Sequence, residues 1–414
     1  MQLKMKNEGR ANLAGVITFV VIVAVIMLIA LINAPTRGGP QVMATATTYL
    51  GEVGKTAIPY LLIIAIAAVV IAGFAAAMVR REWPNRRRRM TMLAGYGFLA
   101  PYLLVTLTFT IGVILFALYI SFFNYNIFQA PVWVGIKNYL KAFAGFTDPT
   151  QAAFLQSLYN VLWYAIIVVP LQTAAAILLA VLLNGRMRFR QFFRVIFYAP
   201  SVTSSVVITL IFIWLYLRTG FINFVFASVL GVVGIHWQAL NWLQDPRGLI
   251  ELIVNAFGGK IAFAQWYLKG PSIAWMAIMF QNIFTTAPTF MIMFLAALQD
   301  INPTLYEAAS IDGASGWQSF WNITLPLLRP IILLVIVLGT IGTLQVFDQV
   351  YLATQGGPLG TTQVPVYQVY TEALGVNGPI QMGYASALAF ILAVIIFLFT
   401  YIQRRFLERG TELY

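Results

Sequence analysis

The chain has 414 residues, of which 60% are apolar and only 9% are charged, and its formal net charge is +12. Soluble domains contain about 25% charged residues, so this composition excludes a soluble globular protein and indicates one that crosses a membrane several times. The chain has no Cys and one His, which excludes disulfide frameworks, thiol nucleophiles and Cys/His metal sites.

Eight apolar stretches are long enough to cross a bilayer as helices. The first is longer than the apolar core of a signal peptide and lacks an obvious cleavage site, so we expect an uncleaved span. We expect Pro170 to break the fourth span, and Pro288 lies inside the sixth. The predicted class is an all-α integral membrane protein with eight transmembrane helices, at residues 13–32, 58–79, 98–121, 159–183, 200–217, 273–298, 330–347 and 384–402.

Two basic stretches, 80–90 and 185–194, lie beside predicted spans. Such stretches are compatible with binding to nucleic acid or to anionic lipid. Loops rich in Lys and Arg also remain in the cytoplasm, and we favour this interpretation, with membrane lipid as a contact and no nucleic acid as a partner. With the N-terminus inside, 17 of the 25 Lys and Arg residues lie in inside segments, which predicts an N-in/C-in topology.

A polar stretch, 299–329, separates the sixth and seventh spans and falls on the cytoplasmic side in this topology. Asn302 is suited to cap a helix whose first residue is Pro303, where a missing N–H has no consequence. We expect this helix to end at about Ile311. The Asp312-Gly313 pair predicts a turn in which the glycine adopts the left-handed conformation.

A second helix is predicted to begin after this turn. Ser315 and Gln318 have the spacing of a capping box, in which each side chain bonds to the other residue's backbone N–H. We expect Pro326 and Pro330 to break this helix before the chain re-enters the membrane.

The pattern E-A-A-x-x-D-G-A, followed by Phe320, Ile323, Leu325-Pro326 and Pro330, resembles the EAA loop of ATP-binding-cassette (ABC) import permeases. It is most similar to the sugar and oligosaccharide branch, which includes the larger membrane subunit of the maltose transporter. The resemblance implies a type I ABC importer permease domain at 96–414 with a coupling loop at 299–330, preceded by a two-span extension with a basic cytoplasmic loop at 1–95. It implies that an ATPase is contacted by Glu307, Ala308, Ala309, Asp312, Gly313 and Ala314. An amphipathic hairpin without a partner is the alternative interpretation.

The same resemblance implies the partners and the location of the chain. These are a second homologous permease subunit, two ATPase subunits and an extracytoplasmic sugar-binding protein, in a bacterial or archaeal cytoplasmic membrane. The chain itself has no G-x-x-x-x-G-K-[ST] phosphate-binding loop. We therefore expect a transporter subunit and not an enzyme, with no catalytic residue and no cofactor, because ATP is bound by the partner subunits.

None of the predicted spans contains Asp, Glu, Lys, Arg or His. Ion-coupled transporters keep ionisable groups near the membrane midplane, and an intramembrane hydrolase needs a general base or a metal, so both classes are excluded. A pathway for an uncharged solute remains. Its candidate contacts are polar residues of the sixth span at i, i+3, i+4 and i+7 and of the seventh span: Asn282, Thr285, Thr286, Thr289, Thr343 and Gln345. Ordinary hydrogen bonding between helices is the alternative role for each.

In the maltose-transporter subunit the sugar lies between the spans that flank the coupling loop. Asn282 and Pro288 match that subunit in residue type, whereas differences occur at Thr286, Thr289, Gly342 and Thr343. The resemblance therefore implies a neutral sugar, with maltose, a malto-oligosaccharide or a related disaccharide as the expected substrate. The alternatives are a non-importing channel and a sensor scaffold that shares the coupling loop.

The outer loop between the fifth and sixth spans contains Asn241-Trp242-Leu243 and Asp245-Pro246, which resemble a recurrent stretch of sugar permeases. This stretch is a candidate docking surface for the binding protein. Its tryptophans are equally suited to be anchors at the membrane interface.

Overall fold

The computed structural model describes residues 86–129, 131–148, 151–185, 188–262, 265–376 and 378–407. The first two predicted spans lie outside these residues. The chain divides between Gly112 and Val113 into two compact units. The expected domain boundary between residues 95 and 96 stays a prediction.

The first unit contributes α3 (Arg86–Val105) and a π-helical segment, η1 (Thr106–Ile111). The described part of the basic stretch, Arg86 to Met90, lies in the first turns of α3. Arginine has a high helix propensity, so a run of arginines does not end a helix. With α4 (Gly112–Ile120), these segments form the candidate span Gly97–Ile120, close to the predicted third span.

A short hairpin follows α4 and makes the chain not purely helical. Strands β1 (Phe123–Asn124) and β2 (Val132–Trp133) pair antiparallel. The Nδ2 group of Asn138 donates to the carbonyls of Ser121 (2.8 Å) and Phe123 (2.9 Å) and so fixes the hairpin to the next helix. That helix is α5 (Lys137–Ala142), and η2 (Ala144–Phe146) comes after it.

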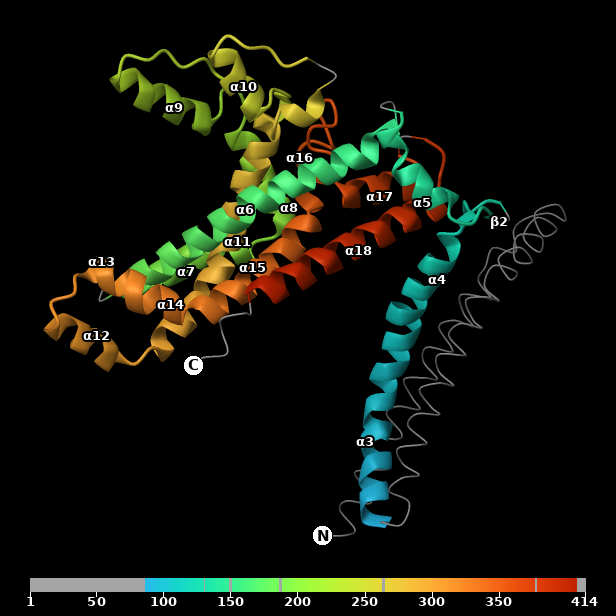
Figure 1. Ribbon diagram of the computed structural model, residues 1–414, viewed down its shortest axis with the longest axis horizontal. Coiled ribbons are helices and arrows are strands. Elements are labelled where there is room, and N and C mark those ends of the chain that lie inside the picture. Colours follow the sequence, from blue (N-terminus) through green and yellow to red (C-terminus); the bar gives the residue numbers. More distant parts are fainter. Residues whose placement is uncertain are drawn as a thin grey trace, which may run out of the picture. The chain divides into compact units, whose positions relative to one another are not determined.

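The centre of the second unit is the pair α6 (Ala153–Asn184) and α11 (Ile273–Asp300), which lie side by side in Figure 1. The rings of Tyr164 and Trp275 lie 4.6 Å apart in their shared core. Pro170 does not break α6, contrary to our expectation. A membrane helix tolerates proline when neighbouring helices and local adjustments satisfy the backbone group that it leaves free.

The predicted fifth span is not one straight helix. It consists of α7 (Arg190–Val202) and α8 (Ser205–Leu215), which meet at a bend of 96°. Between them Thr203 is extended and Ser204, the N-cap of α8, is also non-helical. Apolar composition alone predicts a span but carries no signal for such a bend.

The segment between α8 and α11 lies outside in the predicted topology, and we call it the outer excursion. It contains four short elements, which are α9 (Phe221–Val232), η4 (Trp242–Gln244), α10 (Leu249–Ala256) and η5 (Trp266–Leu268). Trp242 is not a free interfacial anchor, because its Nε1 group donates to Oδ1 of buried Asn223 at 3.2 Å. Trp237 donates to the same oxygen at 3.0 Å. Both tryptophans therefore hold the excursion together.

After α11 the chain is almost continuously helical. Its segments are α12 (Pro303–Ile311), α13 (Gly316–Ser319), π-helical η6 (Phe320–Thr324), α14 (Leu325–Leu327), α15 (Arg329–Leu344), α16 (Asp348–Ala353), α17 (Pro365–Leu374) and α18 (Met382–Leu407). We expected breaks at Pro326 and Pro330, but only one residue between them, Leu328, is non-helical. The prolines are tolerated because each is near the start of its helical segment, where its missing N–H is not needed.

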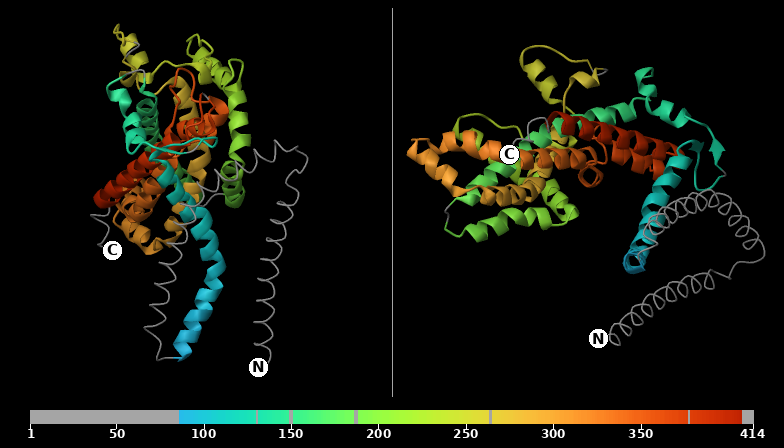
Figure 2. Two further views of the ribbon diagram at one scale, coloured as in Figure 1. Left: turned by 90° about the vertical axis from the view of Figure 1, so that its right-hand side faces the viewer. Right: turned by 60° about the horizontal axis from the view of Figure 1, so that its bottom comes forward.

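By length and composition, five helices of the described residues can cross a membrane, and six can if the bent pair is one span. They correspond to the predicted third to eighth spans. The count of eight spans and the N-in/C-in topology stay predictions. The left view of Figure 2 places α9 and α10 (green and yellow) at the opposite end of the second unit from α12 and α13 (orange).

Candidate functional site

The first candidate site is the α12–turn–α13 hairpin. Asn302 caps α12, because its Oδ1 atom accepts from the backbone N–H of Thr304 at 3.1 Å, and Pro303 is the first residue. Gly313 has φ = +78° in the turn, and a Cβ atom there would meet open space. The left-handed backbone, and not crowding, is therefore what requires glycine. These predictions are confirmed.

The start of α13 also follows the prediction. Ser315 N–H donates to Oε1 of Gln318 at 2.7 Å, and Gln318 N–H donates to Oγ of Ser315 at 3.3 Å. A hydrogen bond of 2.9 Å between the Tyr306 and Thr324 hydroxyls ties α12 to η6. The hairpin is thus held at both helix starts and across its two arms.

The six residues expected to contact an ATPase lie together on this hairpin. Glu307, Ala308, Asp312 and Gly313 are exposed. Ala309 and Ala314 are half-buried, and Ala314 N–H donates to the Ala309 carbonyl at 2.9 Å, which closes the turn. The exposed neighbours include Ile311 (86%) and Trp317 (70%), so the hairpin presents apolar surface as well as polar groups. Such a surface is typical of an interaction site.

The second candidate site is the polar face of α11. Thr285 donates to the Asn282 carbonyl at 2.9 Å, and the Thr286 hydroxyl oxygen lies 2.8 Å from the same carbonyl oxygen. Thr286 lies within 2.7 Å of Oε1 of Gln172 on α6, and Asn282 is 9% exposed. The structure therefore brings these three predicted residues together, on a face that lies partly inside the unit.

The other three predicted contacts lie apart from this group. Thr289 is exposed on α11. Thr343 is buried, and its hydroxyl donates to the Thr340 carbonyl at 3.0 Å. Gln345 is exposed and lines a cavity of about 380 Å³ between α17 and α18 that also includes Val366 and Ala389.

Sequence reasoning missed several polar residues that join helices. Gln172 was overlooked because it stands alone in an apolar stretch. Gln403 on α18 was also missed, and its side chain donates to the Thr340 hydroxyl at 2.8 Å. A single amide in a long apolar helix was the signal that could have found both residues.

Asp348 corrects the expectation that the spans carry no ionisable residue. We ended the seventh predicted span at residue 347, but the candidate span in the structure runs over Arg329–Ala353 and includes this carboxylate. Its Oδ2 atom accepts from the Ser205 hydroxyl at 2.7 Å. Metal binding has no support in the described part of the chain, where no three His, Asp or Glu residues form a group that could hold an ion.

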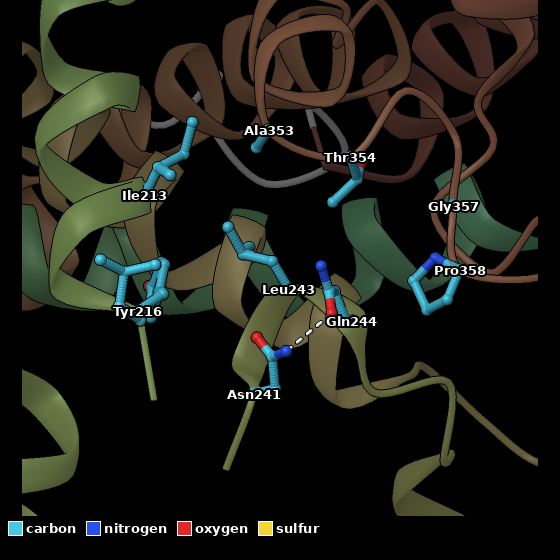
Figure 3. Close-up of a pocket in the computed structure, with 10 residues that line it drawn as sticks. Ile213, Tyr216, Asn241, Leu243, Gln244, Ala353, Thr354, Gly357 and Pro358 are labelled. Carbon is cyan, nitrogen blue, oxygen red and sulfur yellow. Dashed lines mark hydrogen bonds between the residues drawn. The ribbon is translucent and has the colours of Figure 1, made fainter. Parts of the chain in front are cut away.

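A pocket of about 330 Å³ lies at the C-terminal ends of α8 and α16 (Figure 3). Asn241 Nδ2 donates to Oε1 of Gln244 at 2.7 Å on one side of it, and Thr354 and Pro358 face it from the other. Tyr216, also in its lining, donates to the Ala277 carbonyl at 2.7 Å, near the start of α11. Since α11 has 28 residues and is roughly 42 Å long, the pocket lies far from α12.

Known proteins resemble the chain over most of its length. The probable ABC transporter permease protein YesP of Bacillus subtilis is 33% identical over 325 residues, which are 77% of this chain and 91% of that protein. The lactose transport system permease protein LacF of Rhizobium radiobacter is 30% identical over 60% of this chain and 74% of its own. The trehalose/maltose transport system permease protein MalF of Thermococcus litoralis is 29% identical over 74% of this chain and 90% of its own.

The fold is also that of solved transporters. A chain of a bacterial ABC transporter for import of the acidic polysaccharide alginate matches 80% of this chain and 100% of its own, with a TM-score of 0.61 and 23% identity. A chain of an alginate transporter in complex with its periplasmic protein matches 81% of this chain and 98% of its own, with a TM-score of 0.60 and 22% identity. The expected permease fold of an ABC importer is thereby confirmed.

The family model of the binding-protein-dependent transport system inner membrane component matches residues 172–411, which include α11, the hairpin and α15 to α18. The chain therefore belongs to this family and is a multi-pass permease subunit of an ABC transporter, not an enzyme.

Proposed function

We propose that the chain imports a neutral sugar, most simply maltose, a malto-oligosaccharide or a related disaccharide, using ATP hydrolysed by separate subunits. The observation that carries this proposal is the α12–turn–α13 hairpin, capped at both helix starts and exposed at its turn. The names of the relatives, which include lactose and trehalose/maltose permeases, support a sugar as the substrate. They do not agree on one sugar.

The hairpin is the proposed contact site for one of two ATPase subunits. The other ATPase subunit contacts a second, homologous permease subunit. Exposed Glu307 and Asp312 supply polar contacts, and Gly313 provides the rigid turn between the two arms. Closure of the ATPases on ATP moves the hairpin, and α11, which leads directly into it, transmits that movement to the pathway. No cofactor besides the ATP of the partners is required.

The sugar pathway follows the polar groups of α11 and α15. Thr289 and Gln345 are the proposed direct contacts with the sugar, and their exposure supports this role. Asn282, Thr285 and Thr286 form a hydrogen-bonded backing on α11, with Thr343 in the same role on α15. Uncharged hydroxyl and amide groups suit a neutral sugar, since they both donate and accept hydrogen bonds. An extracytoplasmic binding protein delivers the sugar, and the hairpin faces the cytoplasm of a bacterium or archaeon.

The test compares two proline substitutions. Each variant transporter is purified with its native partner subunits and reconstituted in vesicles. Gly313→Pro cannot adopt φ = +78°, so it distorts the turn, whereas Gly316→Pro places proline at the first position of α13, where a helix accepts it. We expect Gly313→Pro to assemble and hydrolyse ATP but to lose sugar uptake, and Gly316→Pro to behave like the wild type.

Normal uptake by the Gly313→Pro complex would disprove the coupling role of the hairpin. Uptake that needs neither ATP nor a binding protein would favour a channel, and a complex that never moves sugar would favour a sensor scaffold. Each of these results contradicts the proposal.

A further inference from the structure

Two interrupted helices meet within the second unit. The break between α7 and α8 leaves Thr203 extended, and α15 ends before α16 begins at Asp348. Ser205, the first residue of α8, donates its hydroxyl hydrogen to Oδ2 of Asp348, the first residue of α16, at 2.7 Å. The two breaks are therefore joined by a hydroxyl–carboxylate hydrogen bond.

This bond belongs to a longer polar chain that reaches α11. The Thr209 hydroxyl donates to the Ser205 carbonyl at 2.7 Å, and Gln281 Nε2 donates to the Thr209 hydroxyl at 2.7 Å. Gln281 and Thr209 are buried, with 2% and 0% exposure. Gln281 directly precedes Asn282, so one connected network runs from the polar face of α11 through α8 to Asp348.

The position of Asp348 is unusual for a charge. In the five candidate spans of the described residues that are not the bent pair, every other Asp, Glu, Lys or Arg is among the first or last two residues of its span. A carboxylate inside an apolar span is unfavourable and is kept for a function. Non-helical backbone at membrane depth is tolerated where it is buried in protein or lines a watery cavity, and transporters build substrate sites at such breaks.

Asp348 is also accessible. It is exposed, and in the part of the chain that the structure describes Ser205 is the only side chain hydrogen-bonded to it, through Oδ2. One turn further, Tyr351 is 38% exposed and stacks on Phe347 with the ring centroids 5.4 Å apart. Tyr351 also packs edge-on against Tyr370, with the ring centroids 5.3 Å apart. Helix α16 thus carries a carboxylate oxygen held by Ser205 and a partly exposed aromatic ring, which are two groups that bind sugars, because sugar hydroxyls donate to a carboxylate and the C–H face of a sugar packs on an aromatic ring.

We infer that Asp348 is a specificity-determining contact, which accepts hydrogen bonds from sugar hydroxyls and disfavours sugars that carry carboxylates. Ser205 is its positioning residue. The inference rests on the proposed sugar transport and extends it, because it explains how this chain selects neutral over acidic sugars. A like charge on the sugar at a few ångströms from Asp348 would be repelled strongly in a site with little water.

The absence of cysteine in this chain allows a direct test. In the Asp348→Cys variant, assembled with its native partner subunits, the thiol is neutral. A sulfonatoethyl thiosulfonate reagent restores a negative charge, and a trimethylammonium reagent adds a positive one. Saturation-transfer difference NMR then measures binding of maltotriose and lactose as neutral probes and of trigalacturonate as the anionic probe. The wild-type complex and Asp300→Cys, at the end of α11, receive the same reagents as controls.

We expect the affinity for trigalacturonate relative to maltotriose to rise about tenfold or more in the unmodified variant, to rise further with the positive group, and to fall again with the negative group. The controls should not change. Ser205→Ala is the second variant. It should weaken the binding of maltotriose several-fold and still reject trigalacturonate, because Asp348 keeps its charge but is no longer held in position.

A ratio that stays the same in all three charge states overturns the inference and leaves the proposed sugar transport intact, since the neutral probes still bind. If Ser205→Ala weakened the binding of both probes equally, the Ser205–Asp348 hydrogen bond would only hold two helices together and would not position Asp348 for the sugar. If neither neutral probe binds to the wild-type complex, the proposed substrate class fails and this inference fails with it.

Discussion

The hydroxyl of Thr286 on α11 donates to Oε1 of Gln172 on α6 at a distance of 2.7 Å. Gln172 is 1% exposed, and among the described residues its buried Nε2 group has no hydrogen-bond partner. A Cβ atom on Gly339 of α15 would meet that Nε2 group. The Gln172 amide thus lies where three helices come together, and Thr286 is the residue that holds it there.

On this face of α11 we therefore expect Thr286 to have a packing role and Thr289 to have a binding role. Thr286→Val removes the bond to Gln172 and leaves its amide buried and unpaired, so we expect the free energy of unfolding to fall by about 1–2 kcal/mol. Thr289→Val alters an exposed side chain and should leave stability unchanged while weakening sugar uptake. Thermal unfolding and uptake of the purified complexes distinguish the two. Equal stability of the two variants would contradict the packing role.

The glycines of α15 provide a second matched pair. Gly339→Ala places a methyl group against the Gln172 amide, and we expect it to lower the free energy of unfolding by about 1–3 kcal/mol. Gly342→Ala, one turn along, has no atom within 4 Å of the new Cβ and should be neutral or slightly stabilising, since alanine favours helix. Thermal unfolding measures both. A stable Gly339→Ala protein would mean that the Gln172 side chain moves away without penalty.

The α12–turn–α13 hairpin was predictable because its signals are local. Asn302, Pro303, Gly313 and the Ser315–Gln318 pair each act on backbone groups within three residues, so the sequence alone indicates their geometry. The family resemblance covers the same residues. Proline was misread because its effect depends on the surroundings, and in a packed membrane protein a helix can continue through it.

The polar pathway was only partly predictable. A period of 3.6 places Asn282 and Thr286 on one helix face but does not say whether that face is turned to a partner helix or to a solute. The answer depends on Gln172, which is 114 residues away from Thr286 in sequence. Asp348 was missed for a simpler reason, because it lies one residue beyond the end of the span as predicted, and only the packed structure shows that the apolar helix path continues.

The cap of α12 can be tested by hydrogen exchange. Asn302→Ala removes the acceptor for the Thr304 N–H, and we expect α12 to lose about 1 kcal/mol and its first turn to exchange several-fold faster. Thr304→Ala is the matched control, since it changes the neighbouring side chain and keeps the cap. The result would count against the cap if both variants exchanged at the same rate in residues 304–306.

Asn223 is expected to be the most sensitive residue of the outer excursion. Its Nδ2 group donates to the carbonyls of Leu217, Arg218 and Leu240, and its Oδ1 atom accepts from Trp237, Trp242 and the Leu240 N–H. Asn223→Ala leaves these buried groups unpaired, and we expect a loss of about 2–4 kcal/mol. Asn241→Ala, which removes one exposed bond to Gln244, should have little effect.

Limited proteolysis reports on this loss, because trypsin cuts after Arg218, Arg247 and Lys260 once the excursion opens. Cleavage should become much faster in Asn223→Ala than in Asn241→Ala. Asn223→Asp should be intermediate, since it keeps the acceptor for both tryptophans but loses the donor to three carbonyls. Similar cleavage rates in all variants would show that the excursion is held by packing and not by this side chain.

The pair of Asp245 and Arg247 should make the start of α11 sensitive to acid. Partial burial by itself raises the pKa of the Asp245 carboxyl, but the hydrogen bonds and the positive charge of Arg247 lower it by more, so this pKa lies below its usual value. A lowered pKa means that the pair stabilises the fold above about pH 4 and that this contribution is lost as the pH falls below that value.

The loop holds α11 directly, because the Ile273 N–H donates to the Arg247 carbonyl at 3.0 Å and the Ala274 N–H donates to the Asp245 carbonyl at 3.3 Å. Arg247 is half exposed, so the contribution of the pair is small, about 0.2–1 kcal/mol. We expect amide exchange at 272–276, corrected for its intrinsic pH dependence, to be constant from pH 7 to 5 and to accelerate below about pH 4. Asp245→Asn should show the faster exchange at every pH, whereas Asp300→Asn, at the other end of the helix, should follow the wild type. If the Asp245→Asn and wild-type curves coincide at pH 7, the ion pair does not hold the start of α11, and the two backbone bonds are sufficient.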